Sequence, residues 1–136
     1  MWIKIQTEIL APLPLVWSSW TTPDDIICWN FASDDWCCPR AECQLRDGGK
    51  FSYRMEAKDG TMGFDFEGEF ISVQTNRKIE FALGDERKVR VSFSEQSGTT
   101  TVTEEFEAEN VHSAEQQKDG WQCILNNFKK HVESKC

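Results

Sequence analysis

Apolar and polar residues alternate along the first ten positions, with isoleucines on one side and charged or polar residues on the other. This period of two is typical of a half-buried β-strand over residues 2–10. A short helix is predicted over residues 14–20, because Pro14 suits the first turn of a helix. Thr22-Pro23 and the two acidic residues after it indicate a second helix, with the threonine hydroxyl as its cap. Residues 30–41 are predicted to form a loop.

The period of two returns at residue 42 and continues to residue 108, which predicts six antiparallel strands. The alternation slips in phase at Phe70-Ile71, where a bulge or bend is expected. Short turns separate the strands, and in the first of them glycine reaches a positive φ without steric penalty. These turns are Asp47-Gly48-Gly49, Asp59-Gly60, Gly84-Asp85 and Ser97-Gly98.

The last part of the chain changes to a helical period. Its apolar stripe predicts an amphipathic helix, the only expected element long enough to cover the buried face of the sheet. With 136 residues the chain is short for two domains, so residues 1–136 are expected to form one. The predicted class is α+β: a curved antiparallel sheet of about seven strands, two short helices after the first strand, and a long C-terminal helix packed across the sheet. The stripe consists of Trp121, Ile124, Leu125, Phe128 and Val132.

The net charge of the chain excludes some classes of binding partner. There are 15 Lys and Arg residues against 23 Asp and Glu residues, a net charge of −8. Nucleic acid is not expected as a partner, because its affinity comes mainly from basic side chains. An anionic membrane surface is disfavoured for the same reason, and the chain has no apolar run long enough to span a bilayer. The N-terminal residues lack the features of a signal peptide, so the expected location is the cytoplasm.

A cysteine-rich segment raises the question of a metal site. Residues 34–39 contain two aspartates and the adjacent pair Cys37-Cys38, and Cys43 follows. Structural zinc usually takes ligands spaced by two to four residues from two elements, so adjacent cysteines fit poorly. Neither a metal nor another cofactor is expected. Redox-sensitive thiols and unremarkable thiols both stay open for Cys37 and Cys38.

The remaining cysteines and the histidines show no ligand pattern. Cys28 and Cys123 are expected to pack as small apolar residues, and Cys136 is an incidental oxidation site. His112 and His131 are expected to face solvent.

Several short motifs occur in a characteristic order and spacing. They are Ala11-Pro12 with Val16-Trp17, Thr22-Pro23 leading to Trp29-Asn30, the segment 45–51 (LRDGGKF), Gly68-Glu69-Phe70, the segment 101–106 (TVTEEF), and the segment 120–128 (GWQCILNNF). Together they resemble the START-like (SRPBCC, helix-grip) superfamily, and within it the single-domain homologues of the Hsp90 ATPase activator, the Aha1 C-terminal domain family. The resemblance covers essentially the whole chain.

The resemblance implies a deep cavity between the sheet and the long helix. Relatives bind lipids, sterols, polyketides or hormones there, and some are cyclases or dehydratases. The chaperone activity belongs to a larger two-domain co-chaperone, of which this chain resembles only the second domain. An exposed edge strand in this fold could also pair with a second copy as a homodimer.

The unusual aromatic content, six Trp, nine Phe and one Tyr, suits such a cavity. The same pattern also suits a packed core, since interiors fill to near-crystalline density. The residues predicted to line the cavity are Trp29, Trp36, Tyr53, Met55, Phe64, Phe66, Phe81, Phe93, Glu104, Phe106, Trp121, Leu125 and Phe128.

Glu104 shares the face of Val102 and Phe106. A carboxylate on an inward face is costly unless it is paired or protonated, and burial would raise its pKa. The simpler interpretation is that Glu104 lies at a strand end or pairs with an inward Arg or Lys. If a reaction occurs, Glu104 and Tyr53 are the candidate catalytic residues for proton transfer.

Three functions follow from these observations. The first is binding of a small hydrophobic or aromatic molecule without catalysis. The second is an enzyme similar to polyketide cyclases or dehydratases. The third is a chaperone-associated interaction module.

Overall fold

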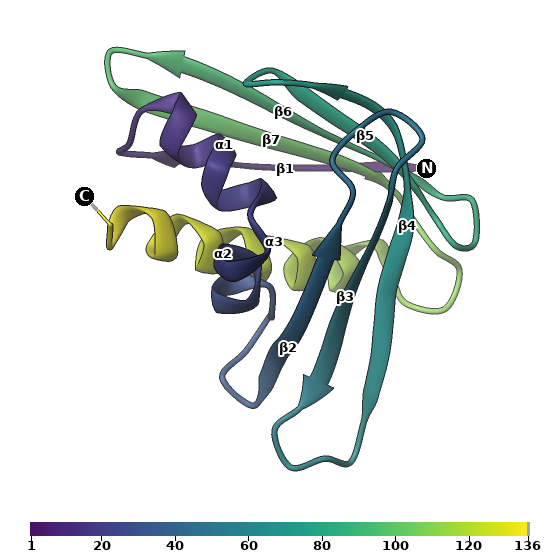
Figure 1. Cartoon of the computed structure of the whole chain (residues 1–136). Helices are drawn as coiled ribbons and strands as arrows, with labels where there is room; N and C mark the ends of the chain where they lie inside the picture. The colour runs from purple at the N-terminus through teal and green to yellow at the C-terminus, as the bar shows by residue number, and fades with distance from the viewer. Residues whose placement is uncertain (136) are drawn as a thin grey trace.

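The computed structural model describes residues 1–135, so Cys136 and its predicted oxidation lie outside the described residues. Three helices lie on the concave side of one curled sheet (Figure 1). No described helix is long and apolar enough to cross a membrane. The elements are β1 (Trp2–Ile9), α1 (Leu13–Thr21), α2 (Pro23–Trp29), β2 (Trp36–Cys43), β3 (Lys50–Ala57), β4 (Gly63–Gln74), β5 (Lys78–Leu83), β6 (Lys88–Gln96), β7 (Thr99–Glu107) and α3 (Ala114–Glu133).

The sheet has seven antiparallel strands in the order β1-β7-β6-β5-β4-β3-β2. Each strand from β2 to β7 pairs with its neighbour in sequence, and β1 returns to pair with β7. The strands β1 and β2 are therefore the two edges. The α+β helix-grip architecture predicted from the pattern is confirmed.

The strand β4 bends the sheet. It is the longest strand, with 12 residues, and its pairing with β5 shifts register between Phe70 and Ser72. The predicted bulge is thus confirmed. Because a bulge increases local bending and twist, β2, β3 and the first half of β4 turn away from the rest of the sheet (Figure 1).

Two glycines in this region are needed for steric reasons. A Cβ on Gly49 would lie 2.0 Å from the carbonyl oxygen of Gln44. A Cβ on Gly68 would lie 2.3 Å from the carbonyl oxygen of Ala82 and 3.0 Å from the ring of Phe51. The absence of a side chain at Gly68 therefore lets the Phe51 ring lie against β4.

The helices begin close to the predicted positions. Pro14 lies in the first turn of α1, and α2 begins at Pro23. Thr22 is the N-cap residue of α2, but its side chain makes no capping hydrogen bond, contrary to the prediction. The helix α3 begins with a capping box in which Ser113 and Gln116 satisfy each other's backbone amides.

The loop predicted over residues 30–41 is wrong in its second half, since β2 begins at Trp36. The strand pairs with β3 alone, and its register shifts between Cys37 and Arg40. Pro39 lies inside that irregularity, where an edge strand tolerates a missing amide. The break in alternation explains why the pattern did not indicate a strand.

Three predictions about isolated residues are also wrong. Cys28 and Cys123 are exposed rather than packed, because they lie on the outer sides of α2 and α3. The His131 side chain is 17% exposed, and its Nε2 lies 2.9 Å from an Asp25 carboxylate oxygen. Lys135 pairs with the same carboxylate, and these contacts join α2 to the end of α3. His112 is exposed as expected.

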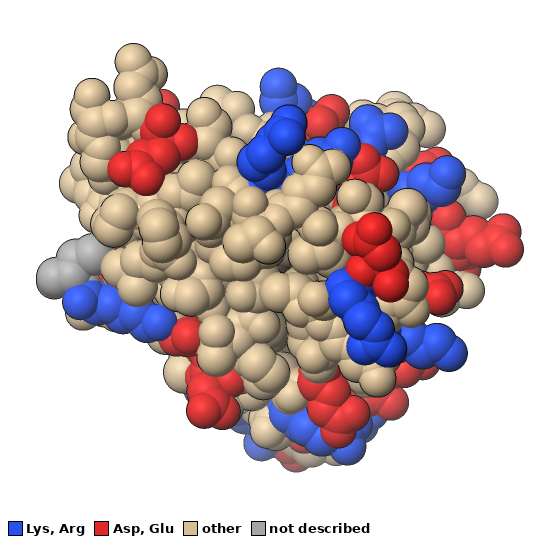
Figure 2. Space-filling view, turned by 45° about the horizontal axis from the view of Figure 1, so that its top comes forward, with Lys and Arg blue, Asp and Glu red and all other residues tan. Residues whose placement is uncertain are grey.

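The surface is mixed in charge. Figure 2 shows basic and acidic side chains interspersed around an uncharged central area of one face. That face carries no continuous basic patch of the kind that nucleic-acid binding uses.

Candidate functional site

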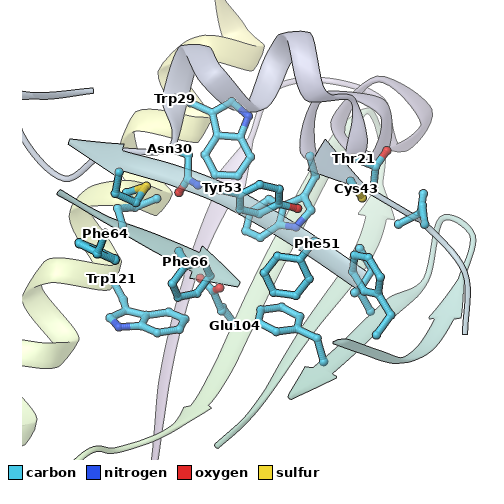
Figure 3. Close-up of a pocket in the computed structure, with 17 residues that line it drawn as sticks. Thr21, Trp29, Asn30, Cys43, Phe51, Tyr53, Phe64, Phe66, Glu104 and Trp121 are labelled. Carbon is cyan, nitrogen blue, oxygen red and sulfur yellow. The ribbon is translucent and has the colours of Figure 1, made fainter. Parts of the chain in front are cut away.

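A cavity of about 190 Å³ lies between the concave side of the sheet and the helices (Figure 3). Every strand from β2 to β5 contributes to it, together with β7 and all three helices. The lining residues are Trp20, Thr21, Trp29, Asn30, Cys43, Leu45, Phe51, Tyr53, Met55, Phe64, Phe66, Phe70, Ile79, Phe81, Glu104, Trp121 and Ile124.

Aromatic rings form most of the wall on the sheet side. The Phe51 ring is central: its centroid lies 5.0 Å from those of Tyr53 and Phe81, and 5.2 Å from that of Phe70. Phe66 joins this wall to α3, with its centroid 6.2 Å from that of Trp121. Such edge-to-face and tilted packing holds each ring through its neighbours, so the wall is a stiff apolar surface.

The cavity reaches the surface at two of its lining residues. Phe64 is 50% exposed and Leu45 is 37% exposed, although both line the cavity. Phe64 lies near the β3–β4 turn, and Leu45 lies just after β2. We therefore expect an apolar molecule to enter past one of these two side chains.

Glu104 lies in the middle of β7 with its side chain directed into the cavity (Figure 3). Its cross-strand neighbours are Ile5 on β1 and Val91 on β6, both buried and apolar. The residue is 7% exposed, and within residues 1–135 its carboxyl group, which borders the cavity, makes no hydrogen bond or ion pair. Burial raises the pKa of Glu104 to about 8.

The simpler interpretation, in which Glu104 lies at a strand end or pairs with an Arg or Lys, is therefore wrong. The residue does not lie at a strand end, and no Arg or Lys among residues 1–135 pairs with it. The neighbouring strands supply only apolar side chains at its level. A hydrophobic core with a purely structural role seldom contains a carboxyl group that has no partner.

Tyr53 lines the same cavity from β3, and its hydroxyl is hydrogen-bonded to Cys43 of β2, which also lines the cavity. Burial raises the pKa of Tyr53 well above its usual value, and the hydrogen bond with the Cys43 thiol raises it further. Burial also raises the pKa of Cys43. Both groups are therefore neutral near pH 7.

The structure brings together many of the residues predicted from the sequence and leaves out others. Trp29, Tyr53, Met55, Phe64, Phe66, Phe81, Glu104 and Trp121 line the cavity, whereas Trp36, Phe93, Phe106, Leu125 and Phe128 do not.

The excluded residues pack against other side chains. The Phe106 ring is stacked directly against Trp121, with centroids 4.0 Å apart, and so lies behind the cavity wall. Phe128 fills the space between Trp20 and Trp29, with 4.8 Å to each centroid. Phe93 packs against Trp17 and Trp20, Leu125 is 1% exposed in the core, and Trp36 contacts Phe64 outside the cavity.

Some lining residues were missed although the pattern carried a signal for them. Phe51, Phe70 and Ile79 fall on the same strand faces as predicted lining residues, and that shared face could have indicated them. Thr21 and Asn30 lie at the ends of α1 and α2, where no periodic signal exists. The other missed residues are Trp20, Cys43, Leu45 and Ile124.

The cysteine-rich segment has no site of its own. Cys38 is 2% exposed, its thiol lies 3.6 Å from the Arg40 carbonyl oxygen, and burial raises its pKa to about 11. A thiol of this kind is a poor nucleophile near neutral pH. Among residues 1–135, no three His, Cys, Asp or Glu side chains converge as metal ligands.

The curled sheet, the covering helix and the aromatic cavity define a helix-grip protein. The model of the family described as Activator of Hsp90 ATPase homolog 1-like protein matches residues 10–133, and the chain belongs to this family. None of the curated proteins matches the sequence significantly.

Solved structures agree with this assignment. The AHSA1-like protein from Aeromonas hydrophila is 43% identical, with 98% of this chain and 93% of that chain covered and a TM-score of 0.93. A protein from Cytophaga hutchinsonii is 41% identical, with 98% and 92% covered and a TM-score of 0.84. A protein from Nitrosomonas europaea shares the fold at 18% identity, with 99% and 96% covered and a TM-score of 0.82.

Proposed function

We propose that the protein binds a small, largely apolar molecule in the cavity between the sheet and α3. The observation that supports this most directly is the cavity itself, which has a volume of about 190 Å³ and is lined largely by aromatic rings. A space of that kind forfeits packing contacts on its lining, which a ligand restores. The routes past Phe64 and Leu45 give the ligand access.

The volume sets the size of the ligand. An apolar cavity of about 150 Å³ binds benzene, so the cavity here suits one ring with a short substituent. A sterol or a long acyl chain is much larger and would require β2–β4 to move away from α3. We therefore expect single-ring compounds to bind without a change of fold.

A pair of variants tests this proposal. Ile124→Trp places a large ring inside the cavity, whereas Val111→Trp adds the same ring at a position that is 84% exposed. Propylbenzene should bind the wild type and Val111→Trp equally, and binding to Ile124→Trp should fall at least about tenfold. Titration calorimetry and amide NMR shifts measure both. Equal binding to all three proteins, or none to the wild type, would contradict the proposal.

Glu104 favours a second candidate function, proton transfer on a small carbonyl compound. Its pKa of about 8 lies close to neutral pH, where a general acid or base works best. Tyr53 stays a candidate for orienting the substrate. In this case Glu104→Gln abolishes turnover of a bound substrate without weakening its binding, and unchanged turnover would rule the role out.

Other partners stay predictions. A chaperone interaction would show as co-purification with Hsp90 at micromolar concentration. Pairing of two copies through β1 or β2 would show in the molecular mass in solution. The cytoplasmic location and the organisation of residues 1–136 as one domain are likewise expectations from the sequence.

A further inference from the structure

Among the described residues that line the cavity, Glu104 is the one carboxylic acid, and none is basic. No Lys, Arg or His side chain is among the residues that line it. Tyr53 and Cys43 are neutral near pH 7, so Glu104 is the lining group that can carry charge. A negatively charged ligand would find no counterion there and would meet a carboxyl group.

The surroundings leave the Glu104 carboxylate without compensation inside the protein. Ile5 and Val91 flank it across the sheet, and Val102 and Phe106 flank it along β7. Its oxygens border the cavity and form no hydrogen bond with residues 1–135. An ionised carboxylate here therefore requires a positive charge and hydrogen-bond donors from outside the chain.

The aromatic wall suits the same kind of partner. Phe66 and Trp121 line the cavity together with Glu104, and the Phe51 ring lies deeper in the same wall. Ring faces attract a cation within about 6 Å of their centroids, most strongly when water is excluded. The net charge of −8 also raises the local concentration of cations around the molecule.

We propose that the preferred ligand is an organic cation, a single apolar or aromatic group that carries one primary amine, with the ammonium hydrogen-bonded to Glu104. This inference rests on the proposed binding function and narrows its ligand class. It predicts discrimination against carboxylates, including fatty acids, as well as against neutral hydrocarbons of equal size.

The proposal implies a pH dependence of binding. Ile5 of β1 and Val91 of β6 lie beside Glu104 across the sheet. The other titratable groups that line the cavity are Tyr53 of β3 and Cys43 of β2, and both stay neutral. Glu104 releases its proton to solvent when the ammonium binds. Amine affinity should therefore fall about tenfold per pH unit on acidification below pH 7.

Three probes of similar size separate this inference from the proposed function. They are 2-phenylethylamine (a cation), propylbenzene (neutral) and phenylacetate (an anion), each titrated calorimetrically at about pH 7.5. The wild type should bind the amine at least about tenfold more tightly than propylbenzene, and phenylacetate should not bind. If propylbenzene binds as tightly as the amine, the inference fails while the proposed function stands. If none of the three binds, both fail.

Two variants with the same change of charge provide the control. Glu104→Gln removes the carboxylate in the cavity, and Glu105→Gln removes the next one along β7, which lies on the opposite face of the sheet. Glu104→Gln should lose the preference for the amine and its pH dependence while still binding propylbenzene. Glu105→Gln should bind all probes as the wild type does. A preference that survives in Glu104→Gln, or amine binding that strengthens on acidification, overturns the inference.

Discussion

The concave side of the sheet is filled at one end and hollow at the other, although the same residue types line both ends. At the filled end, Trp17, Trp20, Trp29, Phe93 and Phe128 pack ring against ring, and we call them the filled cluster. Trp20 and Trp29 lie at its boundary and also line the cavity. At the other end, Phe51, Tyr53, Phe66, Phe70 and Phe81 contact one another along the sheet and border the cavity; they form the cavity wall.

The difference comes from geometry rather than composition. The helix α3 packs closely against the sheet through Leu125, Phe128 and Val132, all at most 1% exposed. Beyond the bulge in β4 the sheet curls away from α3 (Figure 1), so its inner face contacts the helix through Phe66 and Trp121 but leaves a cavity beside them. A ring inside the filled cluster, such as that of Phe128, is thus packed on all sides, whereas a ring in the cavity wall has one side left for a ligand.

The largest expected difference between the two regions is the loss of folding stability when an aromatic ring is removed. Phe128→Ala should destabilise the fold by about 3–5 kcal/mol, because the ring is fully buried against Trp20 and Trp29. Phe66→Ala should cost about 1 kcal/mol, since this ring is half-buried and already borders a cavity. Urea unfolding of both variants measures the contrast. Equal losses would show that the two regions are packed alike.

The second effect concerns Glu104 and the pH dependence of stability. Its pKa is about 8 in the folded state, against 4.5 for an ordinary glutamate, so the folded state binds the proton more tightly. The resulting stabilisation is present at low pH and is lost as pH rises through about 8. The free energy of unfolding of Glu104→Gln, relative to that of wild type, should therefore rise by on the order of 3 kcal/mol between about pH 5.5 and about pH 9. Glu105→Gln serves as the control, and a pH-independent difference for Glu104→Gln would contradict the burial of this carboxyl group.

The smallest effect compares two neighbouring residues of α3. Ile124 lines the cavity, and Leu125 lies in the filled core at 1% exposure. Ile124→Phe should leave stability within about 0.5 kcal/mol of wild type, because the cavity accepts the added volume. Leu125→Phe should cost about 1–3 kcal/mol through overpacking. Thermal unfolding distinguishes the two, and a similar cost at both positions would mean that the cavity has no room.

The sequence pattern predicted the fold well because alternation and helical spacing report which face of each element is buried. It identified the bulge at Phe70-Ile71, the turns and the α3 stripe for that reason. It missed β2, where Pro39 and a register shift interrupt the alternation. It also could not detect the pair of Asp25 and His131, which are distant in sequence.

The same pattern could predict only part of the candidate site. Phe93 and Phe81 look alike in sequence, yet one packs against Trp17 and the other borders the cavity. Whether an inner-face ring packs in the core or borders the cavity depends on the distance between the sheet and the helices. That distance follows from the curl of the sheet. Alternation did place Glu104 on the inner face, but whether it had a partner depended on side chains from β1 and β6.

A crystal structure under xenon pressure would show whether the cavity is an apolar space that admits a ligand. Xenon binds dry apolar cavities of this size. We expect a xenon site within the wall formed by Phe51, Phe66 and Trp121, and none in the filled cluster. Crystals that show no xenon between the sheet and α3, with these rings collapsed onto one another, would contradict it.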